Sequence, residues 1–145
     1  MPNWCENNLT ITHTDPELIK KAADGFRGSG FLSAFMPIPQ ALQDTIAGSY
    51  ADPVEQAALE AKEKANIAEY GYKNWYDWSI ANWGPKWDIS EEEPTVSEDG
   101  LTLTVGFQSA LSPPIGFYNL FCSIWNIARR DKFKYHDWYY FWNIN

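Results

Sequence analysis

The chain has 145 residues, the usual size of one domain, and a domain of this length buries roughly 70% of the surface that its unfolded chain exposes. Eight Trp, eight Tyr and eight Phe make 17% of the sequence aromatic, which excludes a largely disordered chain. The two cysteines, Cys5 and Cys122, are too few for a disulfide-stapled scaffold and lie in no C-x-x-C pair of the kind that binds zinc.

The formal net charge of −8 is concentrated in the middle of the chain. Residues 31–99 hold thirteen acidic and four basic side chains, whereas residues 100–145 hold two acidic and four basic ones. Because proteins bind phosphate backbones through clustered Lys and Arg, this balance argues against nucleic acid as the main ligand. The sequence shows neither a signal-peptide pattern nor an apolar run of about 18 residues, so we expect a cytoplasmic protein without a membrane segment.

The first third of the chain predicts a strand followed by a helix. Asn8–His13 alternates polar and apolar side chains, which is typical of a half-buried strand. Asp15 before Pro16 is a strong helix start, and apolar residues at helical spacing continue to Phe26. The glycines in 28–30 end this helix.

The middle of the chain predicts two helices after an irregular segment. We expect residues 31–39 to be ordered but irregular, since Pro37 and Pro39 exclude a regular helix there. Residues 52–70 are rich in Ala, Glu and Lys with a thin apolar stripe, which predicts a surface helix. Aromatic residues three and four apart predict a short helix over residues 72–82.

The last third predicts two strands, a helix and a closing strand. A strand begins at residues 87–89, and the alternation in 101–107 predicts its hairpin partner. Residues 112–130 predict a helix that opens on two prolines and ends on two arginines. The aromatic-rich segment 133–142 closes the chain as a strand.

The predicted order of elements is β-α-(insertion)-β-β-α-β. This order is typical of the α+β class and of the ferredoxin-like, split βαβ arrangement. We therefore expect residues 1–145 to form a single ferredoxin-like domain, with an acidic and largely helical insertion over residues 31–83 between the first helix and the second strand.

Three sequence blocks resemble a known family. They are MPNWCENNLTI at residues 1–11, NWGPKWD at residues 82–88 and SPPIGFY at residues 112–118. In order and spacing they resemble the YubB-type ferredoxin-like family of uncharacterised phage and plasmid proteins. The resemblance implies a ferredoxin-like fold and a mobile-element origin in a bacterial host cell, and it implies no particular activity.

The second block places two tryptophans around a Gly-Pro turn. Trp83 and Trp87 can form a stacking surface for a base or a peptide aromatic, with Lys86 beside it. The alternative, which we favour, is that Trp83 and Trp87 join Trp4 in closing the ends of a small sheet, because aromatic residues are mostly found in cores.

No catalytic or cofactor-binding pattern emerges from the sequence. A cysteine nucleophile needs a base beside it, and only Cys5 with His13 or His136 offers one, so we interpret Cys5 and Cys122 as small buried side chains. The two histidines are 123 positions apart and define no metal site. The glycines in 25–30 lack the Lys-Ser/Thr ending of a P-loop. We expect no enzyme activity, no metal and no cofactor.

The acidic middle segment is the best functional lead. Carboxylates that share a face attract a basic protein surface, although the same charges also serve ordinary solubility. We expect a non-enzymatic accessory protein that binds and inhibits a host protein. The first partner to consider is a defence complex that handles nucleic acid. The sequence leaves homo-oligomerisation open. The residues predicted for this acidic surface are Glu55, Glu60, Glu63, Glu69, Glu91, Glu92, Glu93, Glu98 and Asp99.

A second hypothesis is a small nucleic-acid-binding module. Some ferredoxin-like domains stack bases on aromatic side chains of their sheet, and the closing strand offers aromatic residues next to the only basic neighbourhood of the chain. The residues predicted for this surface are Arg129, Arg130, Lys132, Lys134, Tyr135 and Trp138.

Overall fold

The computed structural model describes residues 3–125, 128–135 and 138–144, and it describes side chains for residues 3–124. The structure is of the mixed α+β kind, and its chain divides into two compact units. The sheet unit comprises Met1–Pro37 and Trp83–Asn145, and the helical unit comprises Ile38–Asn82. Of the segment 31–83 predicted as an insertion, residues 31–37 and Trp83 belong to the sheet unit.

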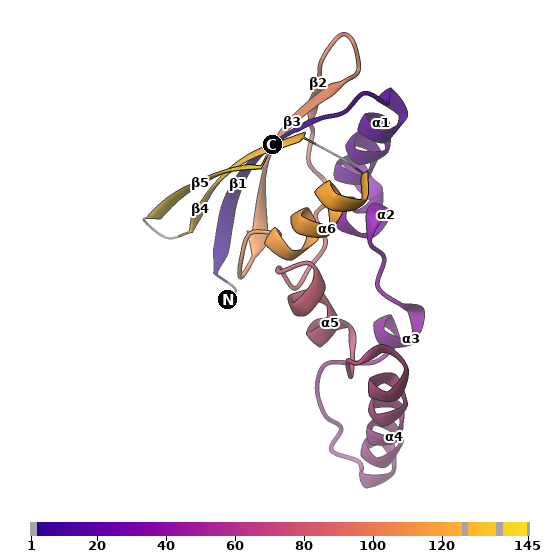
Figure 1. Ribbon diagram of the computed structural model, residues 1–145. Coiled ribbons are helices and arrows are strands. Elements are labelled where there is room, and N and C mark those ends of the chain that lie inside the picture. The colour runs from indigo at the N-terminus through magenta and orange to yellow at the C-terminus, as the bar shows by residue number, and fades with distance from the viewer. Residues whose placement is uncertain (1–2, 126–127, 136–137, 145) are drawn as a thin grey trace. The chain divides into compact units, whose positions relative to one another are not determined.

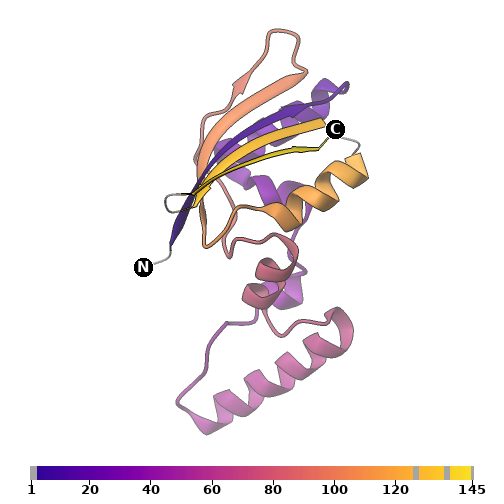
Figure 2. The same cartoon turned by 60° about the vertical axis from the view of Figure 1, so that its left-hand side comes forward.

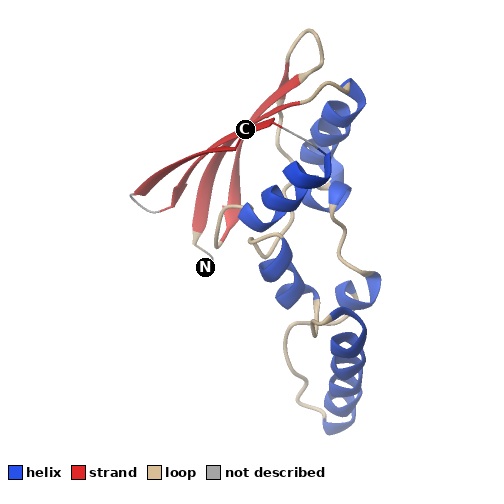
Figure 3. Cartoon of the chain, viewed as in Figure 1, coloured by secondary structure: helices blue, strands red, loops and turns tan. Residues whose placement is uncertain are grey.

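The sheet unit is built on a five-stranded antiparallel sheet (Figures 1 and 3). β1 lies in the centre of the order β2-β3-β1-β4-β5, paired with β3 on one side and with β4 on the other. Buried residues alternate with exposed ones along β1, which confirms the strand predicted from the same alternation in the sequence. The strands are β1 (Trp4–Thr12), β2 (Thr95–Val96), β3 (Thr102–Ala110), β4 (Ala128–Tyr135) and β5 (Trp138–Ile144).

The closing segment forms two strands where one was predicted. The helix expected over 112–130 ends at Trp125, and residues 128–130 instead begin β4. β4 pairs with β1 from Ala128 opposite Thr12 onward, so backbone hydrogen bonds to the central strand outweigh the local helical pattern.

Helices cover one face of the sheet (Figures 1 and 2). The predicted start of the first helix is confirmed, because the carboxylate of Asp15 accepts a hydrogen bond from the backbone N–H of Glu17 at 3.0 Å and Pro16 occupies the first turn. The helical segments of this unit are α1 (Pro16–Asp24), the π-helical turn η1 (Gly25–Ser29), α2 (Phe31–Phe35) and α6 (Ile115–Trp125).

The expectation of an irregular path from residue 31 is wrong for 31–35, which form α2. The carboxylate of Asp88 accepts hydrogen bonds from the backbone N–H groups of Leu32 at 2.8 Å and Ser33 at 3.2 Å, at the start of this helix. The carbonyl of Ile89 accepts a further bond from Phe31 N at 2.8 Å. Residues 87–89 therefore hold α2 and do not form the predicted second strand, whose place at the sheet edge is taken by β2.

Phenylalanine rings fill the core between the helices and the sheet. Phe26 stacks on Phe31 with ring centroids 4.1 Å apart, and Phe117 stacks on Phe121 at 5.0 Å. Phe31 also contacts Phe117 edge-on at 5.1 Å, which joins the two pairs. All four side chains are buried, and each contributes about 1.5–3 kcal/mol by leaving water.

The helical unit contains α3 (Gln40–Gln43), α4 (Pro53–Tyr70) and α5 (Trp75–Asn82). Asp52 caps α4 by accepting hydrogen bonds from Val54 N at 2.9 Å and from Glu55 N at 3.0 Å, and Gly71 ends the helix in the left-handed conformation at φ 83°. The surface helix predicted over residues 52–70 is confirmed, since only two of its residues are buried.

A polar contact fastens α4 to the rest of the helical unit. The side-chain amide of the buried Asn66 donates to Thr45 Oγ1 at 2.9 Å and to the carbonyl of Lys73 at 2.7 Å. Thr45 Oγ1 in turn donates to the carbonyl of Ala41 at 2.7 Å. Buried polar groups that are satisfied in this way fix one arrangement of their elements, because any other leaves them unpaired.

Candidate functional site

Trp83 and Trp87 have different environments. Trp83 is 2% exposed, its indole N–H donates to the carbonyl of Met36 at 2.9 Å, and its own carbonyl accepts from Phe117 N at 3.2 Å. Trp87 is 44% exposed. The prediction of a core role is confirmed for Trp83 and wrong for Trp4 and Trp87, whose indoles lie at the surface.

Trp87 belongs to an exposed aromatic cluster with Trp4 and Lys86. The ring centroids of Trp4 and Trp87 are 6.0 Å apart with planes inclined at 44°, and Trp4 is 48% exposed. The ammonium of Lys86 lies 4.1 Å from the centroid of the Trp87 ring, a cation–π contact worth about 0.5–1 kcal/mol at an exposed site. Two indoles and a lysine thus share one part of the sheet unit's surface.

The predicted acidic surface is divided between the two units. In the sheet unit, Glu93 Oε1 accepts a hydrogen bond from Arg27 Nε at 3.0 Å. Asp99 accepts hydrogen bonds from the Ser97 hydroxyl and then from Leu101 N, and these lower the pKa of Asp99 below its ordinary value. The Glu93 carboxylate therefore ties its loop to Arg27, and the Asp99 carboxylate holds the turn between residues 97 and 101. The sheet unit holds Glu91, Glu92, Glu93, Glu98 and Asp99, and α4 of the helical unit holds Glu55, Glu60, Glu63 and Glu69.

Most of the α4 carboxylates have no partner among the residues that the structure describes. Glu60 accepts a hydrogen bond from Gln56 Nε2 at 3.0 Å. Within the described part of the chain, the carboxylates of Glu55, Glu63 and Glu69 accept no hydrogen bond and form no ion pair. These three groups are available to a positively charged ligand.

The helical unit also leaves much apolar surface exposed. Its buried apolar side chains are those of Leu42, Leu59 and Trp78. Single exposed apolar side chains are common on protein surfaces, whereas those that gather at one place mark a binding site. The six large apolar side chains that this unit exposes are Ile46, Tyr50, Val54, Ile67, Tyr76 and Ile80.

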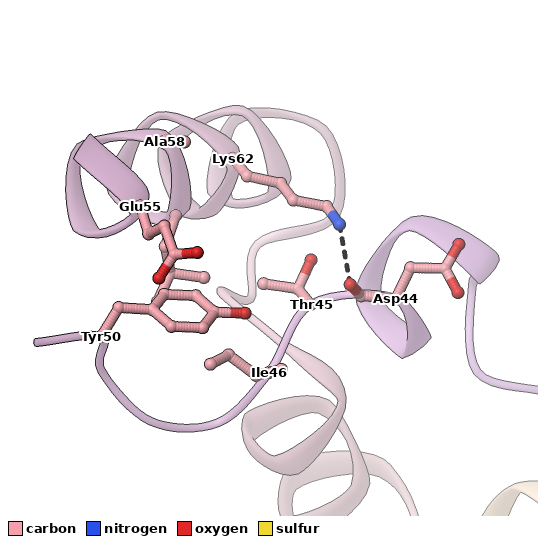
Figure 4. A pocket seen from close by; sticks show the side chains of 8 residues that line it. Asp44, Thr45, Ile46, Tyr50, Glu55, Ala58 and Lys62 are labelled. Atoms are coloured by element: carbon pink, nitrogen blue, oxygen red, sulfur yellow. Dashed lines mark hydrogen bonds between the residues drawn. The ribbon is translucent and has the colours of Figure 1, made fainter. Parts of the chain in front are cut away.

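Two of these exposed side chains line a pocket of about 270 Å³ between residues 44–50 and the first half of α4 (Figure 4). The carboxylate of Glu55 and the ring of Tyr50 both face this pocket. Ile46, Ala58 and Leu59 supply apolar lining. The pocket therefore combines an apolar wall, an aromatic face and an unpaired carboxylate.

The other charged groups of the pocket are already engaged. The ammonium of Lys62 donates to the carbonyl of Asp44 at 2.7 Å, which ties the loop to the helix (Figure 4). The carboxylate of Asp44 accepts from Gln40 Nε2 at 2.8 Å and is turned away from the Tyr50 ring. Glu55 is thus the one lining side chain with a formal charge and no bond to another described residue.

Cys5 does not have the environment of a nucleophile. Its side chain is fully buried, and burial raises its pKa to about 11 against a smaller opposing effect of the hydrogen bond with Ser109 and with a further increase from the charge of Glu6. Cys5 lies near the first end of β1 and His13 directly follows its last residue, Thr12, so the strand separates them by roughly 25 Å at about 3.3 Å per residue. This excludes the pair as a catalytic dyad, and His136 lies outside the described residues.

The described residues contain neither a cluster of metal ligands nor a membrane-spanning helix. Among residues 3–124, whose side chains the structure describes, no three His, Cys, Asp or Glu side chains come together in a way that would hold a metal ion. None of the helices within residues 3–125 has the length and apolar character that a membrane crossing requires.

The basic surface of the second hypothesis lies where only the backbone is described. β4 carries Arg129, Arg130, Lys132, Lys134 and Tyr135, and Trp138 begins β5. The register places Lys134 opposite Glu6 and Lys132 opposite Asn8 in β1. The side chains of all six residues lie outside the described residues.

Several residues of these sites were not found by sequence reasoning. Tyr50 and Ile46 stand in a segment without a periodic pattern, and the only signal is a lone aromatic residue after Gly48 and Ser49. Lys62 gives no signal, because its contact with Asp44 bridges eighteen positions. The pocket exists only once α4 and the preceding loop are folded together.

A scan against protein-family models and searches of curated proteins and of solved structures find no match to this chain.

Proposed function

We propose that the protein is a non-enzymatic binding protein whose helical unit docks on a basic protein. The observation that carries this proposal is that one short unit combines six exposed large apolar side chains with seven acidic residues against three lysines. Exposed apolar patches mark interaction surfaces, and a negative field selects a basic partner and speeds its association.

The proposed partner is a host protein with a basic groove for nucleic acid, such as the nucleic-acid-handling part of a defence complex. An acidic protein that occupies such a groove competes with phosphates for the same Lys and Arg side chains. The resemblance of three sequence blocks to phage and plasmid proteins supports a mobile-element origin, for which an inhibitor of host defence is a fitting role.

We also propose that the sheet unit is a ferredoxin-like, split βαβ domain with β5 added at one edge. The order β2-β3-β1-β4, with all pairs antiparallel and helices after the first and third strands, supports this assignment. In such domains the sheet face away from the helices is open to ligands or partners.

Charge reversal on the helical unit tests the binding proposal. In the variant carrying Glu55→Lys, Glu63→Lys and Glu69→Lys, three carboxylates that bond to no described residue change sign. The fold should therefore persist, while capture of the partner from host lysate falls about tenfold at low ionic strength. Affinity purification with quantitative mass spectrometry measures the captured partner.

A matched variant carries the same change of charge on the sheet unit. Glu91→Lys, Glu92→Lys and Glu98→Lys leave out Glu93 and Asp99, which have structural roles. Capture should fall much less in this variant. Equal losses in the two variants, or no loss in the first, would contradict docking through the helical unit.

A second candidate function is favoured by the cluster of Trp4, Lys86 and Trp87. Exposed indoles beside a lysine suit stacking of unpaired bases, at about 1–3 kcal/mol per base. Titration of single-stranded RNA and DNA into the protein should then quench tryptophan fluorescence, and the Trp87→Ala variant should lose most of the quenching. Absence of quenching at micromolar protein and low salt removes this candidate.

A further inference from the structure

We infer that the pocket between residues 44–50 and α4 holds one arginine side chain of the basic partner. This inference rests on the proposed docking through the helical unit and names the group that the pocket recognises.

The size of the pocket suits one amino-acid side chain. Its volume of about 270 Å³ lies just below the range of roughly 300–1,000 Å³ that is usual for sites of cofactors and drug-sized ligands. Interfaces between proteins commonly take an anchoring side chain of the partner, often Arg, into a small pocket of this kind.

The lining matches the two halves of an arginine side chain. Ile46, Ala58 and Leu59 offer apolar contact to a methylene stem. Tyr50, which is 42% exposed, offers a ring face on which a guanidinium stacks, and Glu55 offers a carboxylate for paired hydrogen bonds. A planar guanidinium uses the ring and the carboxylate together, whereas a lysine ammonium is a compact, strongly hydrated charge.

The pocket offers little to an anion. The N–H groups of Val54 and Glu55 at the start of α4 already donate to the carboxylate of Asp52. The ammonium of Lys62 donates to the carbonyl of Asp44. The charged group of the pocket that forms no bond is therefore the negative Glu55. The positive charge of Lys62 still repels a bound cation, so its removal should strengthen the binding of arginine.

NMR chemical-shift mapping of the full chain tests the inference with N-acetyl-arginine amide as the probe. Backbone amides of Ile46, Tyr50, Glu55 and Ala58 should shift in a saturable way. The uncharged isostere N-acetyl-citrulline amide should bind about tenfold more weakly, because it lacks the charge that Glu55 recognises. Equal shifts with the two probes, or shifts confined to residues outside the pocket, would overturn the inference.

Single substitutions then test each charge. Glu55→Gln should weaken the arginine probe about tenfold, whereas the control Glu63→Gln makes the same change of charge on α4 outside the pocket and should alter binding less than about twofold. Lys62→Gln keeps a donor for the Asp44 carbonyl, removes the repulsion and should tighten binding. Weaker binding of the arginine probe in a folded Lys62→Gln variant would contradict the inference, because removal of a positive charge should strengthen the binding of a cation. Unchanged dispersion of the remaining amide signals establishes that each variant is folded.

The outcome also separates this inference from the proposed function. If the triple reversal on α4 abolishes partner capture but the arginine probe does not bind specifically, the docking proposal stands and the arginine pocket is excluded. If the probe binds specifically but the triple reversal leaves capture unchanged, the arginine pocket stands and docking through the helical unit is excluded.

Discussion

Trp83, Trp87 and Cys5 show how burial decides the chemistry of single residues. Trp83 and Trp87 lie four positions apart, yet one indole is buried with its N–H bonded to Met36 and the other faces solvent beside Lys86. Cys5 is a thiol that burial keeps protonated. Of these three side chains, only the exposed Trp87 is available for binding.

Cys5 should be inert towards thiol reagents in the folded protein. With a pKa of about 11 and no exposed surface, its thiolate fraction near pH 8 is roughly a thousandth. Titration with an aromatic disulfide reagent should therefore modify Cys122 first and Cys5 only on unfolding, with Cys5→Ser as the control. Equal rates for the two thiols would contradict the buried placement.

The same raised pKa of Cys5 predicts the direction of a pH effect. The unfolded thiol loses its proton near pH 9.0 and the folded one near pH 11, so the contribution to stability is complete below pH 9.0 and is lost as pH rises toward 11. Urea unfolding across this interval should show the wild-type protein losing stability more steeply than Cys5→Ser.

Asp88 should stabilise the sheet unit through the start of α2. Its carboxylate accepts from Leu32 N, Ser33 N and Ile89 N, so Asp88→Ala leaves three backbone donors without this acceptor and should cost about 1–2 kcal/mol of unfolding free energy. Asp24→Ala removes only an exposed contact of 3.8 Å to Arg27 and should cost less than about 0.5 kcal/mol. Urea unfolding of the two variants measures the difference, and equal losses would exclude the capping role.

Elements of the sheet unit that are distant in sequence meet at Gly84. This residue has φ 106°, and a Cβ atom at this position would lie 2.9 Å from the carbonyl oxygen of Pro113, just before α6. The turn after Trp83 and the entrance to α6 are therefore in close backbone contact. The same turn connects the buried Trp83 to the exposed Trp87.

Gly84→Ala should lower the unfolding free energy by about 2 kcal/mol or more, because it adds both backbone strain and a clash. Gly28→Ala is the matched control in the same unit, since no atom lies within 4 Å of its added Cβ. Thermal unfolding followed by circular dichroism measures the two effects. A Gly84→Ala melting temperature equal to that of the control would exclude the close approach.

On the scale of the whole molecule, the two units differ in how much apolar surface they bury. The sheet unit has a continuous core of phenylalanine rings over its sheet, whereas the helical unit has three buried apolar side chains and a polar contact centred on Asn66. The cooperative stability of a unit follows the apolar area that it buries, so the helical unit is the weaker of the two. A weakly packed unit with exposed apolar groups gains the most stability when a partner binds and covers those groups.

Hydrogen exchange should therefore show local opening of the helical unit. Amides of α4 should exchange at least about tenfold faster than those of β1 and β3 in the isolated protein. If the helical unit docks on a partner as proposed, binding should slow exchange in α4 selectively. Asn66→Ala should speed exchange in α4 while leaving β1 unchanged. Uniform protection across the two units would contradict this difference in stability.

The sequence by itself determined the elements whose signals are local. Asp15 with Pro16 and Asp52 with Pro53 predicted two helix starts, and the alternation in residues 8–13 predicted the central strand, because caps and periodic patterns act within a turn or a strand. The concentration of acidic residues in 31–99 was also evident from the sequence. Tertiary structure alone decided the rest: α2 depends on a carboxylate more than fifty positions away, β4 on pairing with β1, and the Tyr50 pocket on the packing of a loop against α4. Contacts between distant segments carry no local pattern, so they exist only in the folded chain.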